Sequence, residues 1–200
     1  MDLLGSIGRT LGFSFAAGIN LYATVAILGL ASRFGWVALP EQYRVFDNNW
    51  IIGVALALYV VEFFADKIPW LDSAWDAVHT FIRPVGGAAI AVATLGHASP
   101  ATETMVALLG GALATSTHLS KTGTRVLANA SPEPFTNWIL SLGEDAFVIG
   151  LSALALAHPA AAAIVVLVCV AFIVAFLTWI VRLVGRRFNR PPAKPVTSNQ

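Results

Sequence analysis

Several ionisable side chains lie inside apolar stretches of the sequence, and the first group occupies one predicted helix face. Asp72, Asp76, His79 and Arg83 stand at i, i+4, i+7 and i+11, which makes a continuous stripe on a helix. A carboxylate and an imidazole one turn apart, as at Asp76 and His79, are donors that a divalent metal ion accepts. The same stripe also fits an amphipathic helix at the membrane surface, with aromatic residues on its other side.

Two further groups have helical spacing. Glu62 and Asp66 lie at i and i+4, and His118, Lys121, Thr122 and Arg125 lie at i, i+3, i+4 and i+7. A carboxylate held in a low-dielectric site can exchange protons near neutral pH. Clustered cationic side chains can bind a phosphate or a carboxylate. These residue types therefore suit either a coupling ion or an anionic solute.

Two adjacent acids, Glu144 and Asp145, interrupt another apolar stretch, where inserting them into a membrane is costly. Gly18 and Asn20 interrupt the first apolar stretch and could line an access path. The candidate ion- or solute-binding residues are Asn20, Glu62, Asp66, Asp76, His79, Arg83, His118, Lys121, Arg125, Glu144 and Asp145. The donors that would suit a divalent metal, the one cofactor considered, are Asp76, His79, His118 and Glu144.

The composition indicates where these residues lie. The chain has 200 residues, 57% of them hydrophobic and 12% charged, whereas a soluble domain carries about 25% charged residues. The mean hydropathy is +0.74. A single cysteine, Cys169, excludes a disulfide scaffold, and a formal net charge of +1 argues against a nucleic-acid partner. The composition therefore predicts an integral membrane protein whose surroundings are the lipid bilayer.

The apolar stretches predict an all-α, polytopic membrane bundle of about six transmembrane helices. Two stretches without a charged residue, Thr10 to Ser32 and Pro159 to Val181, are long enough to span a bilayer. Four more, each with an ionisable group, cover residues 50–65, 76–96, 104–120 and 135–157. We predict one membrane domain over residues 1–186 and a disordered cytoplasmic tail over residues 187–200.

Six helices would put both termini on the same side of the membrane. If that side is the cytoplasm, Arg33 and Arg44 lie outside and the other ten of the 12 Lys and Arg residues lie inside. The outer connections near His97 and His158 then carry no Lys or Arg. The charge distribution therefore predicts that both termini are cytoplasmic.

Paired glycines mark two consecutive predicted helices. Gly86-Gly87 follows His79 by seven residues, and His118 follows the second residue of Gly110-Gly111 by seven. Glycine pairs let helix backbones approach closely, which would bring the two histidines to the same level. Two three-helix halves would form a 3+3 inverted repeat, with Asn-Trp dipeptides at 49–50 and 137–138 opening corresponding helices.

Several segments resemble the motifs of a bacterial family of multi-pass membrane proteins, catalogued as domain of unknown function four-one-two-six. They are Gly18–Tyr22, Glu62–Pro69, Trp75–Pro84, Ser116–Arg125 and Ser131–Trp138. The resemblance runs from about Gly12 to Arg186. It implies a protein of the bacterial plasma (inner) membrane and no established activity, so the mechanism must come from the residues.

The polar faces favour a secondary transporter or permease for a small ion or solute, with a pocket open to the cytoplasm. In this hypothesis Glu62 and Glu144 bind a coupling proton or cation. One alternative is a metal-binding intramembrane protein, either a metal permease or a metal-dependent enzyme acting on a lipid-borne substrate. Another is a structural or assembly protein whose charges form internal salt bridges. The expected partners are the bilayer, a small ion or solute, and a second copy of the chain in a homodimer.

Overall fold

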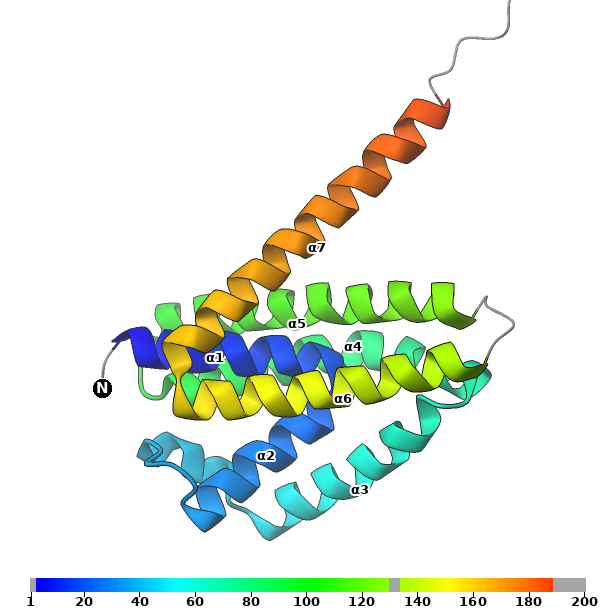
Figure 1. The fold of residues 1–200 in the computed structure, drawn as a ribbon. Coiled ribbons are helices and arrows are strands. Elements are labelled where there is room, and N and C mark those ends of the chain that lie inside the picture. The colour runs from blue at the N-terminus through cyan, green and yellow to red at the C-terminus, as the bar shows by residue number, and fades with distance from the viewer. Residues whose placement is uncertain (1–2, 130–133, 189–200) are drawn as a thin grey trace, which may run out of the picture. The chain divides into compact units, whose positions relative to one another are not determined.

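The described residues are almost entirely helical. The computed structural model describes residues 3–129 and 134–188, and no strand occurs among them. This confirms the predicted all-α fold. The elements are α1 (Leu3–Ile19), α2 (Leu21–Phe34), the 3-10 helix η1 (Glu41–Phe46), α3 (Asn49–Ala65), α4 (Pro69–Leu95), α5 (Pro100–Asn129), α6 (Pro134–Ala157) and α7 (Pro159–Phe188) (Figure 1).

The first apolar stretch is broken at Asn20 into α1 and α2. Asn20 has extended backbone angles (φ −145°, ψ 99°), and its side chain accepts a hydrogen bond of 2.9 Å from the amide of Ala23. Asparagine favours this N-cap position because its side chain competes with the helix backbone for hydrogen bonds. The prediction of one spanning helix over Thr10 to Ser32 is therefore wrong.

Helices α1 and α2 form a hairpin that enters the bundle and returns to the same end. Halfway along α1, the hydroxyl of Thr10 lies 3.1 Å from that of Thr94, close to the end of α4. Beyond α2, Gln42 in η1 donates to the carbonyl of the same Thr94 at 3.4 Å. The middle of α1 and the connection after α2 thus lie beside the end of α4, and the break between α1 and α2 lies farther along α4 (Figure 1).

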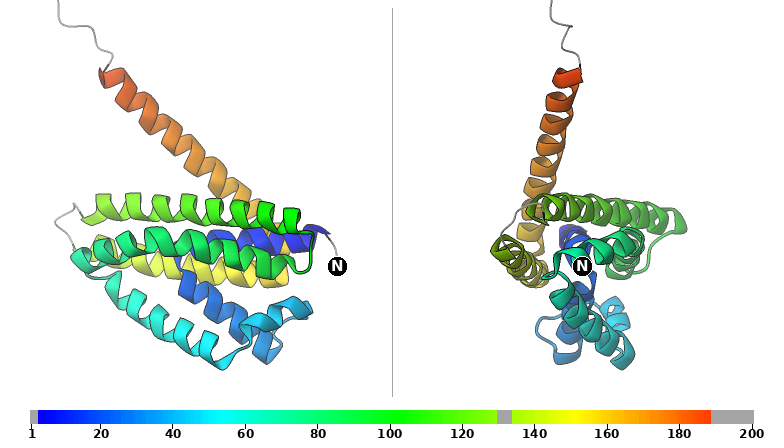
Figure 2. Two further views of the ribbon diagram at one scale, coloured as in Figure 1. Left: turned by 180° about the vertical axis from the view of Figure 1, so that it is seen from behind. Right: turned by 90° about the vertical axis from the view of Figure 1, so that its right-hand side faces the viewer.

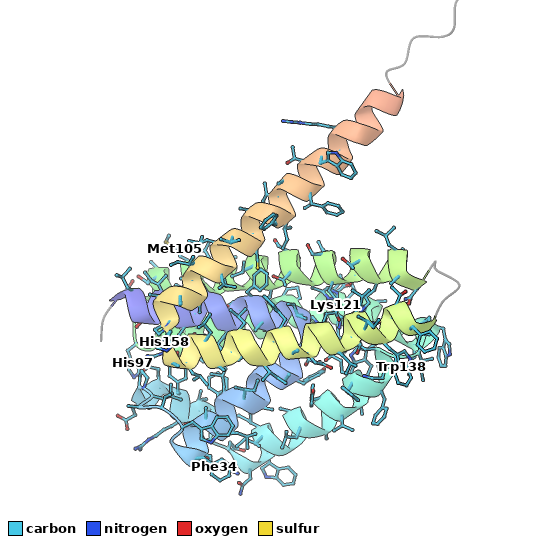
Figure 3. All side chains as sticks on the ribbon, in the orientation of Figure 1. Phe34, His97, Met105, Lys121, Trp138 and His158 are labelled. Atoms are coloured by element: carbon cyan, nitrogen blue, oxygen red, sulfur yellow. The ribbon has the colours of Figure 1, made fainter. Side chains whose placement is uncertain are left out.

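The hairpin changes which residues share an end of the bundle. Arg9 donates to the carbonyl of Leu156 at 3.5 Å, and Gly8 lies against the backbone of Pro159, so the first half of α1 lies beside the α6–α7 connection that holds His158. His97 lies at this end as well (Figure 3). The prediction that Arg9 and His158 face opposite sides is wrong, because a returning hairpin replaces a single span. Which end is cytoplasmic stays a prediction.

Helices α4 and α5 are antiparallel neighbours in very close contact (Figure 2). A Cβ atom on Gly110 would overlap the Cβ of Ala91 and lie 2.9 Å from the carbonyl oxygen of Gly87. Helix α1 packs against both, and a Cβ on its Gly18 would overlap the carbonyl oxygen of Ala114. The predicted role of the glycine pairs in close helix approach is confirmed.

The outer surface of the bundle is apolar, as a bilayer requires. Helix α4, residues 135–157 of α6 and residues 159–179 of α7 are long and apolar enough to cross a membrane. In α4, Trp70 and Phe81 are 72% and 79% exposed, whereas Asp72 and Arg83 are fully buried. The charged stripe therefore faces inward, and an interfacial helix with a solvated charged face is not what α4 forms.

The chain divides into two compact units, one up to Val166 and the other from Leu167. Helix α7 passes through this division and continues to Phe188, two residues into the predicted tail. The rest of that tail lies outside the described residues. The break at Asn20 has no counterpart in α5, the corresponding first helix of the second half, so the element order does not support the 3+3 inverted repeat.

Candidate functional site

The predicted polar faces converge on a charged centre inside the bundle. Its carboxylates are Glu62, Asp66, Asp72, Asp76, Glu144 and Asp145, and its cationic side chains are Arg83, Lys121 and Arg125. These residues come from α3 to α6 and the turn after α3. All are buried except Glu144, whose side chain is 17% exposed. Within residues 3–129 and 134–188 the centre is thus closed, and a pocket open to the cytoplasm stays a prediction.

Arg83 links four elements from a fully buried position in α4. Its guanidinium bonds to Glu62 of α3 at 2.5 Å, to Nδ1 of His118 in α5 at 2.6 Å and to the carbonyl of Gly18 in α1 at 3.1 Å. A guanidinium only donates, so Nδ1 of His118 accepts and its ring proton is on Nε2. That nitrogen then donates to the hydroxyl of Thr80 at 3.1 Å.

Arg125 forms the second junction. It bonds bidentately to Glu144, with 3.1 Å from Nε to Oε1 and 2.6 Å from Nη2 to Oε2. It also donates to the side chain of Asn137 at 2.8 Å and to both the carboxylate and the carbonyl of Asp66. Asp72 lies 3.7 Å from the same guanidinium. Bidentate charge-assisted bonds of this kind fix α5, α6 and the end of α3 together.

The end of α1 meets two of the cationic side chains. Lys121 bonds to Asp66 at 2.9 Å and also donates to the carbonyl of Ile19 at 3.4 Å. Arg83 donates a hydrogen bond to the neighbouring carbonyl, that of Gly18. The last carbonyls of a helix have no partner within it and carry its negative dipole end. Lys121 and Arg83 therefore satisfy the broken end of α1 in the interior.

The start of α2 meets a carboxylate. The side-chain amide of Asn20 donates to Oδ1 of Asp145 at 3.1 Å, while its oxygen caps the amide of Ala23. Asp145 is the twelfth of 24 residues in α6, so this contact lies halfway along the helix. A negative charge is favourable at the positive end of a helix. The two half-helix ends at the break thus meet charges of the opposite sign.

His79 bonds to Tyr22 and to its own helix, and to no charged side chain of the centre among the described residues. Its Nδ1 donates to the carbonyl of Trp75 at 2.7 Å, so its Nε2 accepts from the hydroxyl of Tyr22 at 2.9 Å. Tyr22 also lines a groove of about 650 Å³ between α2, η1, α3 and α4. The two predicted histidines lie at the same level, with His118 bonded to Thr80 next to His79, but they do not face each other.

The four candidate metal donors are not brought together. Asp76 accepts from Thr122 at 3.0 Å, His79 bonds to Tyr22, His118 accepts from Arg83, and Glu144 accepts from Arg125. Within residues 3–129 and 134–188, no three His, Cys, Asp or Glu side chains gather as a metal ion would need. The donor set thus gives the metal alternative no geometric support.

Negative charge exceeds positive charge in this centre. Its six carboxylates face three buried cationic side chains, so negative charge stays in excess if every carboxylate is ionised, even when the half-buried Lys67 near Asp145 is included. Several of their oxygens are also buried without a hydrogen-bond donor. These are Glu62 Oε2, Asp66 Oδ1, Asp72 Oδ1, Asp76 Oδ1 and Asp145 Oδ2. Such atoms are costly unless a proton or another cation joins them.

The structure adds contacts that the sequence analysis did not assign. Asn137 accepts from Arg125 and donates to the carbonyl of Asp66 at 3.1 Å, contacts that its predicted place at the start of a helix does not imply. Thr80 and Thr122 connect His118 and Asp76 to the network. The sequence already places Thr122 on the polar face of His118, Lys121 and Arg125, and the signal for Thr80 is its position four residues after Asp76.

The comparisons with known proteins give a family and nothing further. A sequence model described as a domain of unknown function, DUF4126, matches residues 7–179. No curated protein and no solved structure matches the chain.

Proposed function

The chain belongs to the DUF4126 family, and from its residues we propose that it is a secondary transporter or permease for a small ion or solute. The observation that carries the proposal is the meeting of the hairpin tip with the charged centre. Asn20 at the break contacts Asp145, and the last carbonyls of α1 contact Arg83 and Lys121. We place the protein in the bacterial inner membrane, in keeping with its apolar helices.

Non-helical backbone at membrane depth is tolerated where it is buried in protein or lines a water-filled cavity. Transporters use such breaks because half-helix ends present unpaired carbonyls and amides to an ion or substrate. Here the same groups face the charged side chains of α4, α5 and α6. The hairpin is therefore the element whose movement would expose or close the centre.

The closed conformation of the charged centre limits which kind of solute can bind there. Arg83, Lys121 and Arg125 each contact at least one carboxylate, so none is free to take an anion in this conformation. An anionic solute would have to displace Glu62, Asp66 or Glu144. A proton or a small cation can join without displacing anything, because unpartnered carboxylate oxygens are already present. We therefore expect coupling by a proton or small cation.

Charge movement in reconstituted vesicles tests the proposal. Proteoliposomes on a solid-supported electrode are challenged in turn with steps of pH, sodium, potassium, ammonium, chloride, phosphate and acetate. Wild-type protein should give a transient current with at least one of these, and Glu62→Gln should abolish it. The control is Glu41→Gln, because the side chain of Glu41 is 87% exposed in η1. Silence in every step, or full current from Glu62→Gln, contradicts the proposal.

The density of salt bridges favours a second candidate, a structural or assembly protein. In that case the charges only hold the helices together, and breaking one buried pair costs about 3–5 kcal/mol. Any single loss of charge would then lower stability and produce no specific defect in flux. A Glu144→Gln protein that unfolds at the wild-type temperature yet loses a defined current would exclude this candidate.

A further inference from the structure

Asp145 differs from the other carboxylates of the charged centre. Among the described residues, each of the other five lies within 4.0 Å of an Arg or Lys nitrogen, and Asp145 has no such partner. It is nevertheless buried, with 6% of its surface exposed. Its Oδ1 accepts from Asn20, and its Oδ2 has no donor. One buried carboxylate oxygen is therefore unsatisfied and unneutralised.

Ionisable groups from α3, the turn after it and α5 lie around Asp145 without pairing with it. The electrostatic neighbours that bear most on it are Asp66 and Lys67 at the end of α3 and Lys121 of α5. Lys67 donates instead to the carbonyl of Phe63 at 2.8 Å and to the hydroxyl of Ser141 at 3.3 Å. Lys121 is bonded to Asp66 at 2.9 Å. Both nearby ammonium groups thus bond to other partners. Tyr59 of α3 is a further ionisable side chain on which the charge of Asp145 acts.

We propose that Asp145 is the residue that binds the coupling proton, and that Asn20 transmits its charge state to the hairpin. The proposal rests on the proposed transport function. A buried carboxylate without a counter-ion is stabilised when a proton neutralises it, and Oδ2 is the free position for that proton. Within residues 3–129 and 134–188, no three Asp, Glu, His or Cys side chains are placed so that they could hold a metal ion together, so the geometry favours a proton over a divalent ion.

Through the hydrogen bond to Asn20, the charge of Asp145 affects how strongly the hairpin of α1 and α2 is held against α6. When Asp145 is ionised, the amide of Asn20 donates a charge-assisted bond to it, and the positive end of α2 faces a negative charge. Protonation removes that charge and weakens both interactions. The proton arrives from water on the side to which the site opens and leaves to the other side. Binding of the proton thus weakens the attachment of Asn20, between α1 and α2, to α6, and release of the proton restores it.

Infrared difference spectroscopy of the full-length protein in liposomes tests the assignment directly. The carbonyl stretch of a protonated carboxyl in an apolar site is recorded during pH titration. We expect this band in wild-type protein and in the exposed control Glu41→Gln, and its loss in Asp145→Asn, whose amide keeps the shape of the carboxyl. Asn20→Ala should keep the band and shift its frequency, because the hydrogen bond to Oδ1 is gone.

The outcomes separate this inference from the transport proposal. A band that persists in Asp145→Asn, or one absent from folded wild-type protein across the titration, overturns the assignment of Asp145. An unshifted band in Asn20→Ala overturns the role of Asn20. In either case, a wild-type current that Glu62→Gln abolishes would still support the transport proposal. If the band behaves as expected and no step elicits current, the proton site stands and the transport proposal fails.

Discussion

The guanidinium of Arg83 donates to Nδ1 of His118 at 2.6 Å, which joins two fully buried side chains of α4 and α5. Since Arg83 cannot accept a hydrogen bond, His118 is neutral in this arrangement. His118 is therefore an acceptor that completes the shell of a buried cation, together with Glu62 and the carbonyl of Gly18. That role differs from the metal-binding role that its residue type suggested.

Replacing His118 tests this acceptor role. His118→Ala leaves Nη1 of Arg83 without this acceptor, and an unsatisfied buried donor costs about 1–3 kcal/mol. His118→Asn should recover part of that loss, because the Asn oxygen occupies the position of Nδ1. The free energy of unfolding, measured by SDS titration of the purified protein, gives the order wild type, Asn, Ala. Equal stability of the Ala and Asn variants would contradict the acceptor role.

The Asn20 cap and the Asn20–Asp145 bond can be separated by comparing two N-caps. Asn20→Ala loses the cap of α2 and the contact with Asp145, whereas Asn48→Ala loses only the exposed cap of α3. Loss of a cap alone costs about 1 kcal/mol. We expect Asn48→Ala to cost that amount and Asn20→Ala to cost about 1 kcal/mol more, since a hydrogen bond to a carboxylate is also lost. SDS unfolding measures both, and equal costs would mean that the contact with Asp145 contributes no stability.

The sequence was informative where periodicity decides the outcome. Apolar length and the i, i+4, i+7 spacing of Asp72, Asp76 and His79 predicted helices with one polar face, and those faces do converge. Periodicity could not reveal the break at Asn20, because Leu21 to Phe34 continues as apolar as the residues before it. The break depends on tertiary partners for the freed carbonyls, namely Arg83 and Lys121, which come from distant segments.

The pairing within the charged centre was equally beyond the sequence. Spacing places His79 and Arg83 on one stripe, but it does not determine which neighbouring helix each side chain contacts. His79 turns to Tyr22 and Arg83 turns to Glu62. A divalent site needs donors to converge within bonding distance, which one-dimensional spacing on a single helix does not determine.

The close contact of α4 and α5 predicts a strong position dependence for glycine substitution. Gly110→Ala would drive a Cβ into Ala91 and against the carbonyl of Gly87, and overpacking of this kind costs about 1–3 kcal/mol. Gly143→Ala in α6 meets no atom within 4 Å and should be neutral or stabilising by up to about 1 kcal/mol, since alanine favours helix. Thermal unfolding in detergent compares the two. A Gly110→Ala protein as stable as wild type would mean that the helices can separate freely here.

Two tyrosines predict opposite effects of removing a hydroxyl. The hydroxyl of Tyr43 in η1 is buried without a hydrogen-bond partner, whereas that of Tyr22 bonds to His79 at 2.9 Å. Tyr43→Phe should raise the free energy of unfolding by about 1 kcal/mol, and Tyr22→Phe should lower it by about the same amount. SDS titration at neutral pH measures both, and a loss of stability in Tyr43→Phe would contradict the unpaired hydroxyl.

The same residue predicts a difference at alkaline pH. Tyr43 lies in the η1 connection outside the spanning helices, and burial raises the pKa of its phenol above the usual value of 10.0. Above about pH 10 the unfolded phenol ionises while the folded one keeps its proton, so unfolding is favoured as the pH rises. Wild-type stability should therefore fall by up to about 1.4 kcal/mol per pH unit relative to Tyr43→Phe. SDS titration of the two proteins at several pH values between 9 and 11 gives the free energy of unfolding of each. If the difference between these two free energies stays constant across that range, the Tyr43 phenol ionises as readily in the folded chain as in the unfolded one.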